Sequence, residues 1–189
     1  MEKFESDIIN SINILQQCGI ILYPTDTIWG IGCDVTNADA IKKIYQLKKR
    51  EEKKSMIILL AHVSDIKNYV LHPSKKIIDF ISQQKKPTTA IYNNAINLPR
   101  ELVNADGSVA IRIVRDTFCE IILQHLQRPL VSTSANISGD VPPENFSMIS
   151  PKIKDGVDYI VQHRQDEFQI FQPSSIIRLD NNNEIERIR

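Results

Sequence analysis

Four short segments of the sequence collect side chains that could bind a polar, negatively charged substrate. In residues 23–34, YPTDTIWGIGCD, two threonines and an aspartate follow an apolar run and precede two glycines. Hydroxyl groups at a strand end can hydrogen-bond a polar ligand, and glycines let a ligand approach the backbone. A tight turn closed by its own threonine hydroxyl groups is the alternative. The segment contains neither G-x-G-x-x-G nor a Walker A sequence, so neither a dinucleotide fold nor a P-loop is supported.

The second segment is basic and follows a predicted helix. Residues 48–54, KKREEKK, place five cations among seven residues. Such a cluster could clamp a triphosphate, with arginine binding bidentately and lysine acting as a point charge. The alternative is a solvated charge run that complements the helix dipole, diluted by Glu51 and Glu52.

The third and fourth segments add hydroxyl groups and one arginine. Residues 132–139, STSANISG, present four hydroxyl groups and an amide after an apolar run. Such groups orient a substrate without adding charge, although a loop whose side chains satisfy one another has the same composition. Arg112 lies in the otherwise apolar stretch 108–114. It either points to solvent from an edge strand or, on a concave surface, needs an anion.

Composition and charge restrict the classes of protein that fit. The chain has 189 residues, 42% hydrophobic and 24% charged, which predicts one globular domain over residues 1–189. Lys plus Arg and Asp plus Glu are 23 each, which argues against a protein that binds polyanions by bulk charge. Three widely spaced cysteines and four dispersed histidines predict neither a disulfide framework nor a zinc site. An acidic N-terminus and the absence of a long apolar run predict a cytoplasmic protein.

Helices and strands must position these segments, and apolar periodicity predicts both without a regular βαβ series. Predicted helices cover residues 3–17, 38–48, 64–69, 74–84, 117–127 and a short stretch from 150. Predicted strands cover residues 20–23, 56–61, 88–92, 108–114, 130–134, 159–161, 174–179 and 184–189; none is predicted over 24–34. Asn37 and Ser64 are expected to cap helices, and Thr117 with Glu120 fits a capping box. The expected fold is a mixed, twisted sheet with helices packed on it.

Five motifs stand in one order along almost the whole chain, from about residue 8 to residue 189. They are YPTDTIWGIGCD, LKKR with Lys54, SVAIRI, STSANISG and PSSIIRL. In this arrangement the sequence resembles the YrdC/Sua5 family of threonylcarbamoyl-AMP synthases. The resemblance implies an α/β fold, with a twisted mixed parallel and antiparallel sheet, helices packed on it, and a basic concave face.

The resemblance also implies a reaction and its participants. The family's enzymes condense L-threonine, bicarbonate and ATP to L-threonylcarbamoyladenylate, and they release pyrophosphate. Mg²⁺ would be held through the ATP phosphates, without a dedicated protein metal site. A threonylcarbamoyl transferase complex would then take the product and modify adenosine 37 of tRNA.

The family's motifs imply roles for individual residues of this chain. Lys48 and Arg50 correspond to the K-x-R pair at the ATP phosphates and are the implied catalytic residues. The other implied ATP contacts are Lys54, Ser108, Asn136 and Arg189. The implied threonine contacts are Thr27, Arg112, Ser134 and Ser174, with the Arg112 guanidinium expected to hold the threonine carboxylate or the carbamate.

The sequence departs from the family's pattern at several positions. Lys49 stands where glycine is frequent, and Ser55 stands where the family has proline. Leu59 occupies the position of a histidine that contacts threonine in some members, so no histidine role is transferred. Ser175 stands where threonine is usual. The sequence does not include the extra C-terminal domain of longer relatives, so we expect a loop or a partner to close the site.

Two other functions fit parts of the sequence. A basic concavity without chemistry would make a non-catalytic module for RNA binding or ribosome maturation, with tRNA or other RNA as its partner. Zero net charge and the few aromatic residues among the basic ones count against that module. A related enzyme could instead make a different carbamoyl-adenylate from carbamoyl phosphate, although such enzymes carry further domains.

Overall fold

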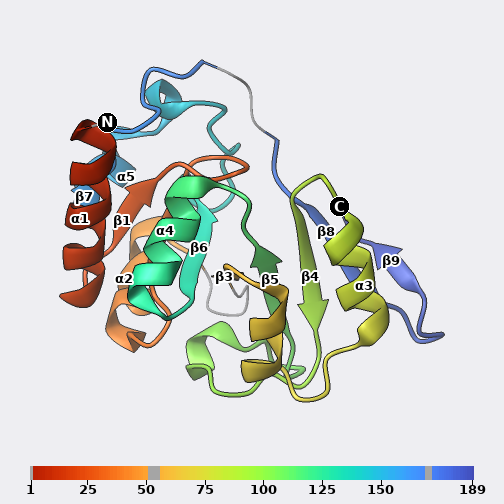
Figure 1. Cartoon of the computed structure of the whole chain (residues 1–189). Helices are drawn as coiled ribbons and strands as arrows, with labels where there is room; N and C mark the ends of the chain where they lie inside the picture. The colour runs from red at the N-terminus through yellow and green to blue at the C-terminus, as the bar shows by residue number, and fades with distance from the viewer. Residues whose placement is uncertain (1, 51–55, 169–171) are drawn as a thin grey trace.

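One mixed sheet organises the protein. The structure is a computed structural model that describes residues 2–50, 56–168 and 172–189. Its strands follow the order β7-β1-β2-β6-β3-β5-β4-β8-β9 across the sheet (Figure 1). The helices are α1 (Glu2–Gln16), α2 (Ala38–Lys48), α3 (Lys75–Gln83), α4 (Thr117–Leu126), α5 (Pro151–Asp155) and the 3₁₀ helices η1 (Val63–Asn68), η2 (Arg100–Leu102) and η3 (Phe146–Met148). The strands are β1 (Ile21–Tyr23), β2 (Gly30–Asp34), β3 (Ile57–Leu60), β4 (Thr88–Tyr92), β5 (Val109–Ile113), β6 (Leu130–Ser134), β7 (Tyr159–Ile160), β8 (Ser175–Leu179) and β9 (Ile185–Arg187).

Both kinds of strand pairing occur in this sheet. Strand β1 pairs parallel with β7, β3 with β5, and β4 with β8. The remaining neighbours pair antiparallel. The prediction of an α/β fold with a mixed sheet and packed helices is therefore confirmed.

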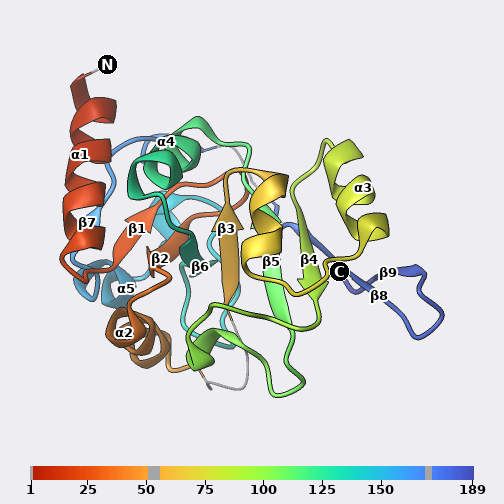
Figure 2. The same cartoon turned by 60° about the horizontal axis from the view of Figure 1, so that its bottom comes forward.

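The two faces of the sheet bury different hydrophobic clusters, because successive side chains of a strand point to opposite faces. Ile58 and Leu60 of β3 belong to one cluster, which includes residues of α2 and α3. Leu59 belongs to the other cluster, together with residues of α1 and α4. Helices α1 and α4 lie side by side (Figures 1 and 2).

Strand β2 is the strand that the sequence did not predict. It lies between β1 and β6 and contains Gly30 and Gly32, two residues that disfavour a strand by propensity. Packing explains the glycine at 32, because a Cβ there would collide with the Val131 carbonyl oxygen and lie 2.8 Å from the Tyr23 ring. A contact between neighbouring strands thus overrides local propensity.

The helix N-termini confirm one predicted cap and correct two. The Asn37 side chain caps α2 by accepting a hydrogen bond from the Ala40 amide at 2.9 Å. The capping box at Thr117 is wrong: Asp116 is the N-cap of α4, and Thr117 is the first helical residue. The carboxylate is one residue earlier and accepts from the Cys119 amide at 3.0 Å. Ser64 caps nothing either, because the 3₁₀ helix η1 begins at Val63 without a side-chain cap.

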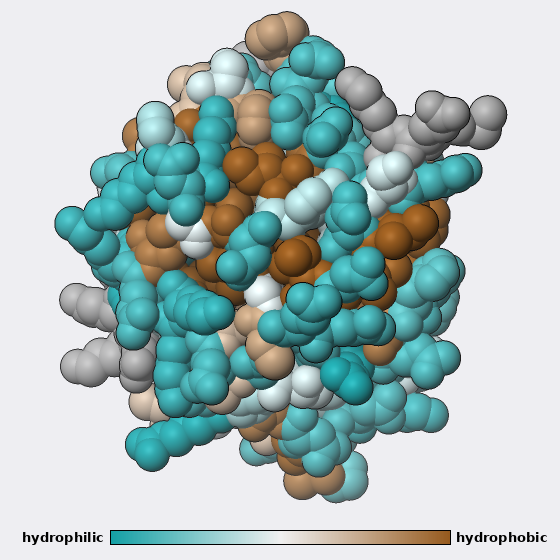
Figure 3. All heavy atoms as spheres, turned by 90° about the vertical axis from the view of Figure 1, so that its left-hand side faces the viewer, coloured by the Kyte–Doolittle hydropathy of each residue, from teal (hydrophilic) through white to brown (hydrophobic). Residues whose placement is uncertain are grey.

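The surface mixes hydrophilic and hydrophobic residues. On the face at the left of Figure 1, hydrophobic side chains lie between hydrophilic ones (Figure 3). Ile9 of α1 is 59% exposed, and Phe168, beyond β7, is 74% exposed. Within the described ranges, no helix has both the length and the apolar character that crossing a bilayer requires.

Candidate active site

A cavity of about 470 Å³ lies against the middle of the sheet. Alternate residues of neighbouring strands line it, among them Ala110 and Arg112 of β5 and Ser132 and Ser134 of β6. The strand register places Arg112 beside Leu59, so the cavity lies on the face that α1 and α4 cover in part. Alanine and serine side chains are short, and they leave this part of the face unfilled.

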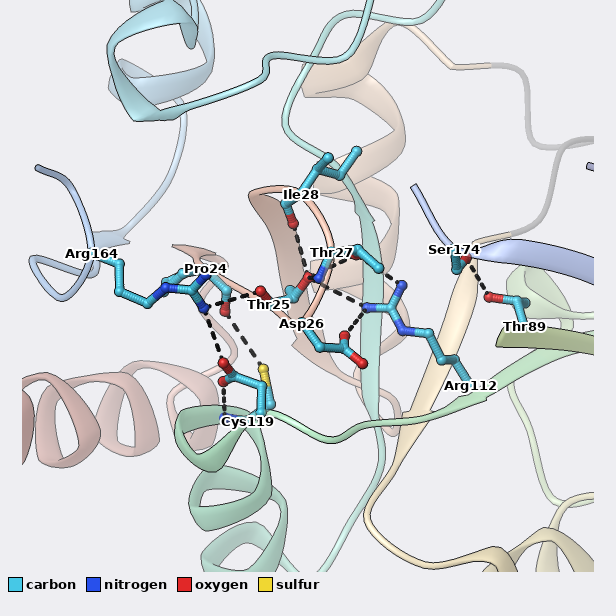
Figure 4. Close-up of polar contacts among 11 residues, drawn as sticks. Pro24, Thr25, Asp26, Thr27, Ile28, Thr89, Arg112, Cys119, Arg164 and Ser174 are labelled. Carbon is cyan, nitrogen blue, oxygen red and sulfur yellow. Dashed lines mark hydrogen bonds and ion pairs between the residues drawn. The ribbon is translucent and has the colours of Figure 1, made fainter. Parts of the chain in front are cut away.

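The threonine-rich loop between β1 and β2 holds the Arg112 guanidinium (Figure 4). Arg112 is 4% exposed, and its Nη1 donates to Thr27 Oγ1 at 3.1 Å. Its Nη2 lies 3.5 Å from Thr25 Oγ1 and 3.2 Å from the Asp26 carboxylate. Thr25 Oγ1 also accepts from the Thr27 amide at 3.0 Å and donates to the Ile28 carbonyl at 2.9 Å. The loop therefore closes its own turn and presents Thr27 to the cavity as well, which combines the two interpretations of this segment.

Two further arginines, Arg50 and Arg189, line the same cavity. Arg189 Nε and Nη2 donate to the Ser174 carbonyl at 3.3 and 3.1 Å, and the Ser174 hydroxyl group lies 2.8 Å from Thr89 Oγ1. Burial lowers the pKa of Arg189, and the nearby charge of Arg112 lowers it further. Burial also lowers the pKa of Arg50. Three arginines, and neither aspartate nor glutamate, are among the described residues that line the cavity.

Lys48 lies beneath the cavity and does not line it. The residue is 1% exposed. Its Nζ donates to the Ser134 carbonyl and, at 2.6 Å, to the Asn136 carbonyl. The Ser138 amide donates back to the Lys48 carbonyl at 2.8 Å. Burial, and next the charge of Arg50, lower the pKa of Lys48 to about 7. Lys48 thus joins the end of α2 to the loop that follows β6.

Three other residues with implied roles in nucleotide binding are not among the described residues that line this cavity. Asn136 Nδ2 donates to the Ile137 and Asp140 carbonyls at 2.9 and 2.7 Å, which closes the turn after β6. Ser108 lines a neighbouring cavity of about 710 Å³. Lys54 lies outside the described residues. The structure therefore brings together, around one cavity, Thr27, Arg50, Arg112, Ser134, Ser174 and Arg189.

Two partly buried ionic residues at this site were given no role in the sequence analysis. Asp26 was noted as part of its motif, but only the threonines and glycines of that motif were given a possible role. Arg164 Nη1 donates to the Thr25 carbonyl at 3.1 Å and to the Asp116 carboxylate at 3.0 Å (Figure 4). Arg164 follows β7 in a segment without a recognisable motif, so only the fold could reveal its contact with the loop.

The site offers neither an activated thiol nor a protein metal cluster among the described residues. Cys119 is fully buried, and burial raises the pKa of its thiol well above the usual range. Within the same residues, no group of three or more histidines, cysteines or carboxylates is placed to hold a metal ion. The polar groups that remain are guanidinium, hydroxyl, amide and backbone groups, which can bind and orient anions.

Comparisons with known proteins identify relatives of this chain. The model of the Sua5/YciO/YrdC family, described as "Telomere recombination", matches residues 13–189. The threonylcarbamoyl-AMP synthase of Pseudoalteromonas translucida is 29% identical over 160 residues, which cover 83% of this chain and 86% of that one.

Solved structures show the same fold. Sua5 of P. abyssi superimposes with a TM-score of 0.86 at 20% identity, over 96% of this chain and 55% of that chain. P. abyssi Sua5 complexed with L-threonine superimposes with a TM-score of 0.80 at 19% identity, over 91% and 50%. At these identities, the likeness to the solved structures establishes the fold.

Proposed function

The chain belongs to the Sua5/YciO/YrdC family, and from that membership we propose that it is an L-threonylcarbamoyladenylate synthase. It would condense L-threonine, bicarbonate and ATP, with release of pyrophosphate. One observation carries the proposal: three arginines and several hydroxyl groups surround a single cavity, and neither aspartate nor glutamate is among its described lining residues. Such a wall suits two anions, a carboxylate and a polyphosphate, side by side.

The Arg112 end of the cavity is the proposed threonine site. The guanidinium is buried, and Thr25, Thr27 and Asp26 fix its position. A fixed, planar guanidinium can bind a carboxylate through two parallel hydrogen bonds. The Ser134 and Ser174 side chains, which also line the cavity, would hold the remaining polar groups of the amino acid or its carbamate.

Arg50 and Arg189 form the proposed phosphate site. The nucleotide would also contact Ser108, Asn136 and Lys54, and Mg²⁺ would enter with ATP on its phosphate oxygens. Lys48 would contribute by holding the loop after β6 and by its charge, which lies close enough to Arg50 for the arginine to lower the pKa of the lysine.

Catalysis would rest on orientation and on charge. The threonine amine and bicarbonate give a carbamate and water. A carbamate oxygen then attacks the α-phosphorus of ATP, a new P–O bond forms, and the bond to pyrophosphate breaks. Fixed guanidinium groups stabilise the negative charge that develops on the phosphoryl oxygens. The carbamate is already an anionic nucleophile, so alignment of the reactants is the main requirement.

We further propose that the product serves tRNA modification. A mixed carbamic–phosphoric anhydride is an activated acyl donor, and a threonylcarbamoyl transferase complex would pass its acyl group to adenosine 37 of tRNA. That acceptor favours a cytoplasmic location for this chain.

Pyrophosphate release tests the proposed reaction. We would incubate folded protein with ATP and Mg²⁺, add threonine and bicarbonate singly and together, and identify the nucleotide product by mass spectrometry. Release that needs both co-substrates, with the mass of threonylcarbamoyl-adenylate, is expected. Release driven by carbamoyl phosphate instead of threonine, or no release together with tight RNA binding at physiological salt, would contradict the proposal.

A further inference from the structure

Asp26 stands behind the arginine to which the threonine carboxylate is assigned. Its carboxylate lies 3.2 Å from Arg112 Nη2, and the two side chains are 8% and 5% exposed. Arg112 lines the cavity, whereas Asp26 is not among the lining residues. Figure 4 shows Asp26 and the two threonines against one side of the guanidinium. Asp26 is therefore placed to hold Arg112 in position while Arg112 faces the cavity.

The two charges depend on each other. Both Asp26 carboxylate oxygens are buried without a hydrogen-bond partner in the protein, so the ion pair with Arg112 is the principal compensation for the Asp26 charge. Burial raises the pKa of Asp26, and the charge of Arg112 opposes that rise. Arg112 Nε is also buried and has no hydrogen-bond partner in the protein. The terminal nitrogens Nη1 and Nη2 are the ones that hold the loop.

The position of Asp26 also affects which anion Arg112 accepts. A singly charged carboxylate meets a guanidinium whose charge is partly offset by the aspartate behind it. A phosphate group carries more negative charge, so Asp26 repels it more strongly. The wall around Arg50 and Arg189 contains no aspartate or glutamate among its described residues, so no acidic side chain repels phosphate there.

We propose that Asp26 is a positioning residue that fixes the Arg112 guanidinium and makes this end of the cavity select a carboxylate over a phosphate group. The inference rests on the proposed function, because it takes threonine as the ligand of Arg112. On this proposal, the carboxylate substrate binds at Arg112, which has an aspartate behind it, and the phosphate groups bind at Arg50 and Arg189, where no acidic side chain is among the described residues that line the cavity.

Calorimetric titration of L-threonine tests this role, with and without an excess of inorganic phosphate at constant ionic strength. For Asp26→Asn we expect threonine affinity to fall about tenfold or more, because the guanidinium loses its fixed partner. Phosphate should change the wild-type Kd by less than about twofold, and it should compete clearly in the variant. In steady-state kinetics, the threonine KM should rise while the ATP KM and kcat stay within about threefold.

Three controls keep the result specific. Asp155→Asn removes an exposed carboxylate at the end of α5 and should match the wild type. In an Arg112→Gln background, Asp26→Asn should cause no further loss, because it acts through that arginine. Asp26→Glu, which keeps the charge, should still exclude phosphate, and it replaces Asp26→Asn if the asparagine variant does not fold.

The possible outcomes separate the two proposals. A wild-type protein that binds no threonine contradicts the proposed function and this inference with it. A wild-type protein that binds threonine, with an Asp26→Asn variant that binds equally well and excludes phosphate equally well, contradicts this inference alone. An equal rise of both substrate KM values, with a lowered melting temperature, would reduce Asp26 to a structural role.

Discussion

At the scale of single residues, the arginines of the cavity carry the proposed chemistry. Arg50 lines the cavity, and burial lowers its pKa, but a guanidinium keeps its charge at any physiological pH. Its contribution is therefore a fixed positive charge with a planar set of donors. Activity should depend on both properties.

Replacement of Arg50 separates charge from geometry. Arg50→Ala should lower kcat/KM about 100-fold or more, because it removes charge where the transition state gains it. Arg50→Lys should restore part of the loss, since lysine supplies charge without the bidentate fork. Pyrophosphate release measures both, and Arg100→Ala, an exposed arginine of η2, is the matched control. Full activity in folded Arg50→Ala would remove this residue from the phosphate site.

Single residues also show what local sequence can reveal. Thr27, Arg112 and Ser174 stand in recognisable motifs, and their placement at one cavity could be predicted. The Arg164 contact could not, because its partner Thr25 is 139 residues away and no local pattern marks the arginine. Asp26 lies inside a motif, but its proposed positioning role depends on how deeply the fold buries Arg112. The sequence alone does not reveal that burial.

At the scale of elements, Lys48 joins α2 to the loop after β6, and this connection depends on pH. The pKa of Lys48 is about 7 in the folded protein and ordinarily 10.5. Between these values the unfolded chain holds a proton that the folded protein has released, so stability rises with pH in this window. The neutral amine keeps two N–H donors, enough for its two carbonyl partners.

This pH dependence can be measured by urea unfolding at pH 7 and pH 9. Relative to Lys48→Met, the wild-type free energy of unfolding should rise by up to about 2.5 kcal/mol over those two pH units, the limit set by one proton. The methionine variant supplies the background of all other titrating groups. Parallel pH profiles for the two proteins would show that Lys48 keeps an ordinary pKa.

The N-terminus of α4 gives a second test at this scale. Asp116 caps the helix and also pairs with Arg164, which in turn donates to the Thr25 carbonyl. Asp116→Ala should therefore cost about 1–3 kcal/mol of stability. Thr117→Ala, at the position that the sequence suggested as the cap, should cost less than about 0.5 kcal/mol. Thermal unfolding compares them, and a larger loss for Thr117→Ala would contradict the observed cap.

Most strands, but not all of them, could be predicted from sequence patterns. The other strands of the sheet stand out as apolar or alternating runs. Strand β2 does not, because it contains two glycines, of which Gly32 meets a requirement set by Tyr23 and Val131 on neighbouring strands. Local propensity cannot register a packing constraint that arises only when three strands come together.

At the scale of the whole molecule, one cavity should couple ligand binding to global stability. A ligand that binds only the folded state stabilises it by about 2.7 kcal/mol at 100 times its Kd. For a chain of this size that corresponds to a melting-temperature rise of about 5 °C or more. Thermal unfolding should show this rise with MgATP for the wild type and lose most of it in Arg50→Ala. An equal shift in both proteins would place the nucleotide elsewhere.

The register of β2 against β6 has a consequence for how the protein is made. Gly30 pairs with Ser134. The ribosome must therefore add about 100 residues after β2 before the strand that pairs with one edge of β2 has been synthesised. At about 5–20 residues per second, the ribosome needs roughly 5–20 s to supply them. During that interval β1 and β2 can pair only with each other, and β2 presents an unsatisfied edge. The substrate cavity is therefore assembled late in synthesis, and the nascent chain is most vulnerable to mispairing while it waits for β6.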